Sequence, residues 1–147
     1  MQEKSPSTLR IIQIDYLSSI SVIFPIVAWG LVVVARFLDP NAVSFFIRFA
    51  PVITVLGLIV LIWRLQDIRS LFMKGNEVPG VITKIGFFRG RGRVTYVYTY
   101  QGKKYESSNA IQATKFTKSL SQGQNVTIMV DPDKPKHAFI RELYAQK

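Results

Sequence analysis

The chain has 147 residues, with 19 Lys and Arg against 9 Asp and Glu, so its net charge is +10 at neutral pH. It contains no cysteine, which excludes disulfide bonds, thiolate catalysis and cysteine-based zinc sites. Most of the excess charge lies between residues 64 and 147, which carry 15 basic and 6 acidic residues. A basic C-terminal half of this kind indicates contact with anionic lipid head groups or with an acidic partner.

Two apolar runs dominate the first half of the chain, at residues 17–38 and 45–65. At 1.5 Å rise per residue, each helix would match the ~30 Å hydrocarbon core of a bilayer. The first run has no charge from Leu17 to Ala35, and its Ile, Val, Leu and Phe residues favour insertion by roughly 4–7 kcal/mol. The second run has one charge, Arg48, near its start, where the long side chain reaches the interface. We therefore predict two membrane-spanning helices.

Asp39-Pro40-Asn41 lies between the runs and is typical of a tight turn, which predicts an antiparallel helical hairpin. A cleaved signal peptide is the alternative for the first run. The weak basic segment before the run, the length of the run and the second run directly after it all favour the hairpin.

The distribution of basic residues predicts the orientation of the hairpin. Only Arg36 and Arg48 lie at the turn. The opposite end carries Lys4, Arg10, Arg64, Arg69, Lys74 and Lys84. We therefore expect a cytoplasmic segment over residues 1–16, a hairpin over residues 17–74, and both termini in the cytoplasm.

Helical spacing continues beyond the second run. Leu65, Ile68, Leu71 and Phe72 fall on one helical face, which predicts that the second helix extends to about residue 74. We expect this apolar stripe to pack on the C-terminal domain.

From residue 78 onward the pattern becomes strand-like, with short segments rich in Val, Ile, Thr, Tyr and Phe between turn signals. A membrane α+β fold follows, in which the hairpin precedes a small antiparallel β-barrel or rolled sheet over residues 78–143. Between the strands, residues 114–120 form a short helix or a loop with Phe116 and Leu120 facing inward. The predicted strands are residues 78–88, 93–100, 103–111, 125–131 and 137–143.

Several turn and strand motifs in this region are similar to one family. They resemble the bacterial membrane proteins of domain-of-unknown-function family 3592, which joins membrane helices to a small β domain. The resemblance implies the same architecture here, in a bacterial membrane protein. Together with the distribution of basic residues, it leads us to expect a multi-pass protein of the bacterial inner membrane with a cytoplasmic β domain. It supplies no catalytic residues. The motifs are Pro79-Gly80-Val81, Tyr98-Thr99-Tyr100-Gln101-Gly102-Lys103-Lys104-Tyr105, Gly123-Gln124-Asn125-Val126 and Asp131-Pro132-Asp133-Lys134-Pro135.

The first predicted β-hairpin carries the most suggestive cluster, Phe87, Phe88, Arg89, Arg91 and Arg93. If its tip faces the bilayer, the arginines pair with lipid phosphates while a phenylalanine enters the interface. Alternatively, the cluster binds an acidic protein partner, is a solvated turn whose glycines allow positive φ, or, less favoured, binds a nucleic-acid backbone.

A second candidate is the alternating Tyr96, Tyr98 and Tyr100, which form one tyrosine-rich face of a strand. On an exposed face these rings would stack on bases or on another ligand. Alternatively, they pack against one another and against Tyr105.

Catalytic and metal-binding signals are weak. His137 is the only histidine, Asp131 and Asp133 fit a proline-punctuated turn, and no Gly-x-Ser-x-Gly motif surrounds any serine. We expect no enzyme activity, no metal and no cofactor. The leading hypothesis is an accessory or scaffold subunit that contacts the lipid bilayer and binds a protein partner or a second copy. The alternatives are a module for anionic lipid or nucleic acid and, less favoured, a membrane-tethered hydrolase.

Overall fold

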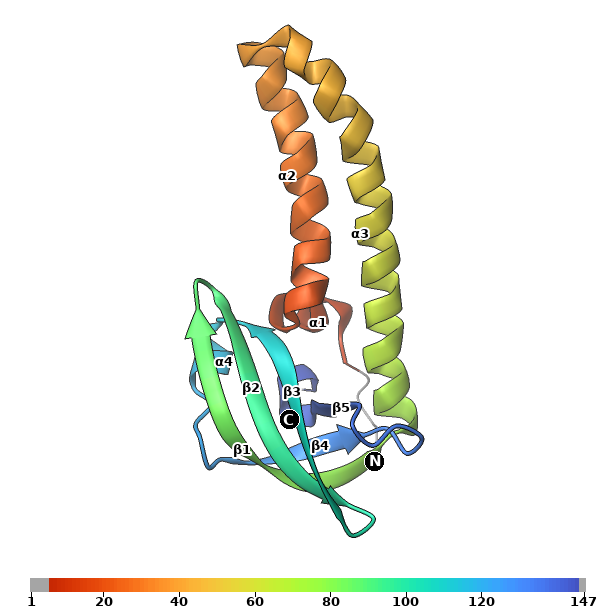
Figure 1. Cartoon of the computed structure of the whole chain (residues 1–147), viewed down its shortest axis with the longest axis vertical. Helices are drawn as coiled ribbons and strands as arrows, with labels where there is room; N and C mark the ends of the chain where they lie inside the picture. Colours follow the sequence, from red (N-terminus) through yellow and green to blue (C-terminus); the bar gives the residue numbers. More distant parts are fainter. Residues whose placement is uncertain (1–5, 146–147) are drawn as a thin grey trace.

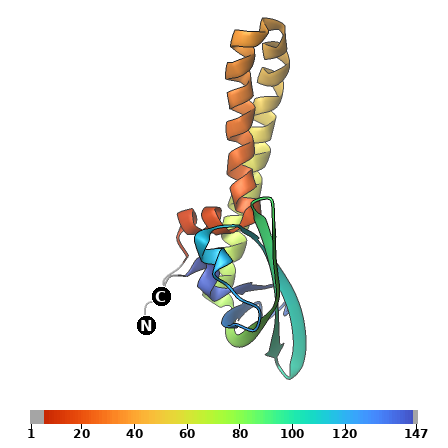
Figure 2. The same ribbon diagram turned by 90° about the vertical axis from the view of Figure 1, so that its left-hand side faces the viewer.

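A computed structural model describes residues 6–145, the side chain of Pro40 excepted. A long helical hairpin rises from one end of a curled β domain (Figures 1 and 2). Lys4 and the rest of residues 1–5, which the orientation argument included, lie outside the described residues.

Three helices precede the β domain. A short helix that the sequence did not predict lies across the base of the hairpin in Figure 2, and Ser7 caps it by accepting a hydrogen bond from the Arg10 amide at 3.3 Å. The next two form the predicted antiparallel hairpin, and the last continues to residue 74 as expected. The helices are α1 (Thr8–Ile14), α2 (Tyr16–Leu38) and α3 (Pro40–Lys74).

The hairpin turn is a single residue. Asp39 ends α2 and caps α3, whose Asn41 amide donates to its carboxylate at 2.9 Å. Farther along, the helices approach closely at Gly57, where a Cβ atom would lie 2.6 Å from the Ser21 carbonyl oxygen. Small residues commonly permit such close packing of membrane helices.

Both α2 and the Asn41–Lys74 part of α3 are long enough and apolar enough to cross a membrane. Their large apolar side chains face outward, and the Trp29 indole donates to the Thr54 hydroxyl at 3.0 Å between the helices.

The β domain is one antiparallel five-stranded sheet that curls into a nearly closed barrel, as predicted (Figure 1). Its strand order is β3-β2-β1-β4-β5, so the strands at the two edges of the sheet meet at the barrel seam. Short helices follow β3 and β5. The elements are β1 (Asn76–Phe88), β2 (Arg91–Tyr100), β3 (Lys103–Gln112), α4 (Lys115–Lys118), β4 (Asn125–Val130), β5 (Ala138–Ile140) and α5 (Arg141–Tyr144).

A buried side chain bridges the seam between β3 and β5. Asn109, 3% exposed, donates from Nδ2 to the Ala138 carbonyl at 3.2 Å and accepts from the Ile140 amide at 3.2 Å. Its amide group thus replaces the backbone ladder that would otherwise join the two strands.

Two local predictions need correction. The last predicted strand, residues 137–143, is a strand only over Ala138–Ile140 and then becomes α5. The chain leaves the sheet there, because the Ala145 amide donates to the Arg141 carbonyl at 2.9 Å, which is a helical hydrogen bond. In the segment over residues 114–120, Leu120 is buried as expected, but Phe116 is 39% exposed and Thr117 is buried instead. The Arg10 guanidinium lies over the Phe116 ring, 5.2 Å from its centre.

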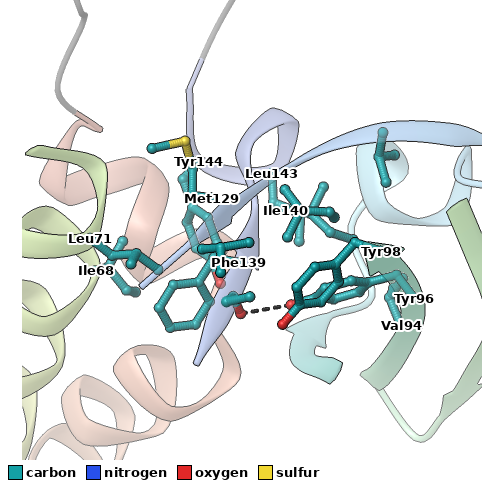
Figure 3. Close-up of a cluster of buried hydrophobic side chains, with 14 of the residues drawn as sticks. Ile68, Leu71, Val94, Tyr96, Tyr98, Met129, Phe139, Ile140, Leu143 and Tyr144 are labelled. Carbon is teal, nitrogen blue, oxygen red and sulfur yellow. Dashed lines mark hydrogen bonds between the residues drawn. The ribbon is translucent and has the colours of Figure 1, made fainter. Parts of the chain in front are cut away.

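The core lies between α3 and the sheet (Figure 3). Ile68, Leu71 and Phe72 project from α3 into it, and Leu65 packs at its margin. The prediction that this stripe docks on the β domain is therefore confirmed.

Candidate functional site

The β1–β2 turn is formed by Arg89 and Gly90, which have φ values of 46° and 84°. Positive φ at both central residues matches the right-handed twist of the flanking strands. The turn projects Arg89 outward, and its guanidinium lies 5.1 Å from the Phe88 ring centre. The sequence-predicted cluster therefore does form a hairpin tip.

The two strands that lead to this tip place two arginines on the outer face of the sheet. Arg91 and Arg93 are exposed, whereas Val94 on the opposite face is buried in the core. Arg91 pairs with Phe88 and Arg93 pairs with Gly86 across the β1–β2 ladder. Within residues 6–145, no carboxylate forms an ion pair with any arginine of the tip.

A groove of about 510 Å³ runs along this face of the tip. Residues of β1, β2 and β3 form one side, and Tyr16, the first residue of α2, contributes from the hairpin. We call this the tip groove. It is lined by Tyr16, Gly86, Phe87, Phe88, Arg91, Gly92, Arg93 and Ala110.

The tip and the base of the hairpin lie at the same height. In Figure 1 the β1–β2 turn reaches the level of α1 and the start of α2, whereas the β2–β3 turn points the opposite way. The isolated bridge between Asp15 and Ile111 holds this end of the sheet beside α2. The basic tip is therefore next to the point where the apolar helices begin.

The tyrosine-rich face points into the barrel instead of outward. Tyr96, Tyr98 and Tyr100 are 0, 2 and 8% exposed, so their rings have no surface for stacking on a base or ligand. Tyr96 donates to the Ala138 carbonyl at 2.6 Å, and Tyr98 donates to the Pro135 carbonyl. Burial raises the pKa of the Tyr98 phenol to about 12. We therefore leave these residues out of the candidate site, since packing accounts for them.

A buried ion pair joins the two helices of the hairpin where they meet the β domain, and sequence reasoning missed it. The Asp15 side chain is 1% exposed and accepts from Arg64 Nη2 at 2.9 Å and from Nε at 3.3 Å. It also accepts from the Ser18 amide and hydroxyl, each at 2.9 Å, and from the Tyr144 hydroxyl at 3.4 Å. Such a bidentate pair with further hydrogen bonds satisfies the buried charges.

A usable signal for this pair exists in the sequence. Asp15 and Arg64 lie at nearly the same number of residues from Asp39, on either side. In an antiparallel hairpin that turns at Asp39, the two side chains fall at the same depth. The missing information was which way each side chain faces.

The ion pair continues into a chain of charged groups on the domain side. Arg64 also contacts Asp67 at 3.0 Å, and the His137 ring lies between Asp67 at 3.3 Å and Asp131 at 3.5 Å. Burial opposes ionisation of Asp131, but the amides of Asp133 and Lys134 and the His137 ring outweigh it and lower the pKa of its carboxyl. These amide contacts make Asp131 a turn-capping residue.

Two serines of the β domain, the residue type that a hydrolase would use as a nucleophile, donate hydrogen bonds to backbone carbonyls. Ser107 donates to the Lys136 carbonyl at 3.1 Å and Ser119 donates to the Phe116 carbonyl at 2.7 Å. Within the described part of the chain, no group of three His, Cys, Asp or Glu side chains is arranged to hold a metal ion.

Comparison with known proteins identifies one family. The family model for "Domain of unknown function (DUF3592)" matches residues 78–143, which confirms the predicted resemblance over the β domain. No curated protein and no solved structure matches the chain.

Proposed function

We propose that this chain, whose β domain belongs to the DUF3592 family, is a non-enzymatic protein of the bacterial inner membrane. In this proposal the α2–α3 hairpin crosses the bilayer and the β domain lies against the cytoplasmic leaflet. The domain acts as an accessory or scaffold subunit for a protein partner in the same membrane or for a second copy. The observation that carries the proposal is the close junction between hairpin and domain. There the paired Asp15 and Arg64 of the hairpin meet the Tyr144 hydroxyl at 3.4 Å and the centre of the Phe139 ring at 4.8 Å.

The surface of the hairpin supports insertion into lipid. Large apolar side chains such as Phe24, Leu31, Val55 and Ile59 are 44–61% exposed along its length. In water, an exposed apolar surface of this extent would favour association with another apolar surface, whereas in a bilayer the acyl chains contact it directly. The helices also satisfy their own backbone hydrogen bonds in lipid.

Charge at the two ends of the hairpin supports the cytoplasmic location of the β domain. Arg10, Arg64, Arg69 and Lys74 lie at the domain end, whereas the turn end carries Arg36 and Arg48. The excess of basic residues at the domain end follows the positive-inside pattern.

The junction supports a scaffold in preference to a flexible tether. Beside the ion pair, Arg10 of α1 donates to the Leu143 and Glu142 carbonyls of α5 at 3.0 and 3.2 Å. Arg64 of α3 lies over the Phe139 ring of β5, with its guanidinium 4.8 Å from the ring centre. A domain held from both helices keeps a constant height and rotation relative to the membrane, as presentation of a surface to a neighbouring membrane protein requires.

Insertion and orientation are tested by cysteine labelling, because the chain has no native cysteine. Ala42→Cys lies near the hairpin turn and Asn125→Cys lies in β4. A membrane-impermeant maleimide is expected to label position 42 in intact cells and position 125 only after lysis. Labelling of position 125 in intact cells, or release of the chain into buffer without detergent, contradicts the proposal.

The scaffold role is tested by purifying the full chain from membranes in mild detergent. We expect a stoichiometric protein partner or a second copy, and we expect Arg64→Met, which loosens the junction, to reduce its recovery while the chain stays in the membrane. Arg69→Met removes the same charge at an exposed site and is the control. Recovery of the wild-type chain only as a monomer contradicts the scaffold role.

A further inference from the structure

We propose that the tip groove binds the phosphate of an anionic glycerophospholipid from the cytoplasmic leaflet. This inference rests on the proposed function, because it needs the β domain beside that leaflet. It assigns a ligand class to a surface for which neither the family match nor the fold supplies one.

Small residues on both sides of Arg93 create room for a ligand. Its paired residues are Gly86 on β1 and Ala110 on β3. Both have little or no side chain, so almost no side-chain volume flanks the arginine across the three strands. A Cβ atom at Gly86 would meet no heavy atom within 4 Å. The floor of the groove is therefore open around this guanidinium.

Closer to the turn, the next outward-facing pair of residues on β1 and β2 supplies a second cation and an aromatic ring. Arg91 pairs with Phe88, which is 60% exposed and forms a wall of the groove toward the turn. The Phe87 ring lies on the opposite face of the sheet, against Gly92, where a Cβ atom would come 2.5 Å from that ring, so the ring beside the arginines is that of Phe88. Two guanidinium groups thus share one hollow with apolar walls.

The charge of the groove is uncompensated within residues 6–145, because no ion pair is formed by Arg91 or Arg93. Guanidinium groups bind phosphate through parallel N–H···O bonds, and a single phosphate bridging two arginines relieves their mutual repulsion. The groove therefore fits one phosphate group.

The position of the groove favours a lipid as the source of that phosphate. Tyr16 lines it and is the first residue of α2, so the groove opens where the apolar helix begins. Tyrosine and phenylalanine beside a cation suit the headgroup region, where rings contact acyl chains and cations contact phosphate. A nucleic acid at the same place would approach an anionic membrane surface, which repels it.

The test uses the full-length chain, delipidated in a non-ionic detergent and titrated with phosphatidylglycerol under native mass spectrometry. Phosphatidylcholine, inorganic phosphate and a single-stranded oligonucleotide are titrated in parallel. We expect one phosphatidylglycerol to bind with preference over the other three. Arg91→Gln with Arg93→Gln is expected to weaken this binding roughly tenfold or more, since each interfacial cation contributes on the order of fivefold.

The β2–β3 hairpin supplies a matched control. Lys103 and Lys104 follow the turn at the opposite end of the domain, where Gln101 and Gly102 have φ values of 50° and 76°, as in the first turn. Lys103→Gln with Lys104→Gln therefore makes the same charge change on the same kind of hairpin, and it is expected to leave lipid binding unchanged.

A second variant separates the groove from charge and from folding. Gly86→Leu keeps both arginines and places a side chain where no neighbour lies within 4 Å of its Cβ, so the strand tolerates it. It is expected to fill the groove and to weaken phosphatidylglycerol binding as strongly as the double arginine variant does, with an unchanged unfolding temperature.

Four outcomes overturn the inference: equal weakening by both double variants, full binding by Gly86→Leu, displacement of the lipid by millimolar inorganic phosphate, and tighter binding of the oligonucleotide. A chain that stays in the membrane but shows any of these keeps the proposed function. A chain that is released from membranes without detergent fails the proposed function itself.

Discussion

The helical hairpin and the β domain place the same residue types on opposite sides, inside in one and outside in the other. The hairpin turns Ile, Val, Leu and Phe outward and buries small or hydroxyl residues such as Ser18, Ser21, Ala28 and Ala50. The β domain buries its Val, Ile and Tyr residues and exposes its lysines and arginines. This difference supports the proposed insertion of the hairpin into lipid, because water favours burial of apolar side chains whereas a bilayer accepts them on the outside. At the junction neither rule holds, because a buried ion pair of the hairpin lies against Tyr144 and Phe139 of the β domain.

The largest expected effect comes from breaking that junction. Arg64→Met leaves the Asp15 carboxylate buried without its cation, which costs about 3–5 kcal/mol of stability. Thermal unfolding of the full chain in detergent measures the loss, and protease sensitivity near residues 64–74 reports whether the domain has separated from the hairpin.

Arg69→Met is the matched control for this variant, five residues farther along α3. Its guanidinium is exposed and bonds only to the Thr8 hydroxyl among the described residues. Adding Asp15→Asn to Arg64→Met is expected to recover part of the loss. Equal unfolding temperatures for the two single arginine variants would show that the buried pair does not couple the two parts.

Within the hairpin, a bulky residue at the close contact of the helices is the next test. Gly57→Val places methyl groups against the Ser21 carbonyl and Pro25, which cannot rotate away, and it is expected to cost about 3 kcal/mol. Gly30→Val makes the same change in helix propensity but meets no atom within 4 Å of its Cβ. The difference in unfolding temperature between the two variants measures the packing alone, and no difference would rule out a tight contact at Gly57.

Within the β domain, the barrel seam is the corresponding test. Asn109→Leu removes both hydrogen bonds across the seam and leaves the Ile140 amide and one acceptor less satisfied, at a cost of about 2 kcal/mol. Ser107→Ala removes one exposed hydrogen bond at the same seam and is expected to cost less than half as much. Chemical unfolding of the two variants compares them, and a larger loss for Ser107→Ala would contradict the role of Asn109.

The smallest effect near neutral pH concerns the buried phenols of the β domain. Burial raises the pKa of Tyr96 and of Tyr144 well above the ordinary value, and that of Tyr98 to about 12. Since the pKa is raised in the folded state, this contribution to stability is complete below about pH 10 and is lost as the pH rises toward the folded-state pKa. Ultraviolet titration of tyrosinate should show these phenols ionising only as the domain unfolds. Ionisation of all six tyrosines near pH 10 with the fold intact would contradict it.

Several elements could be predicted because their signals are local. The apolar runs predict α2 and α3, the spacing of Ile68, Leu71 and Phe72 predicts the extension of α3, and alternation predicts the strands. α1 was not predicted, because its seven residues form less than two full repeats of an apolar face that is visible only once its packing surface is known.

The candidate site likewise contains residues that local sequence signals predicted and residues that they did not. Sequence identified the arginine and phenylalanine tip, because glycines between arginines at a strand boundary are typical of a β-turn. It did not identify Tyr16 as part of the groove, since residue 16 is far along the chain from residues 86–93. It also could not decide the role of the tyrosines, because alternation defines two faces of a strand without showing which one is inside.

By itself, the sequence determined the character of each part of this protein: apolar runs of bilayer length, a tight turn between them and a basic, strand-rich remainder. Only the tertiary structure decided which charges meet, which face of β2 lies inside, and where the basic tip sits relative to the first apolar helix. Periodicity and turn chemistry act over a few neighbouring residues and are readable in one dimension. The Asp15–Arg64 pair, the Asn109 seam and the tip groove each join residues from separate elements, so they exist only once all the elements are packed together.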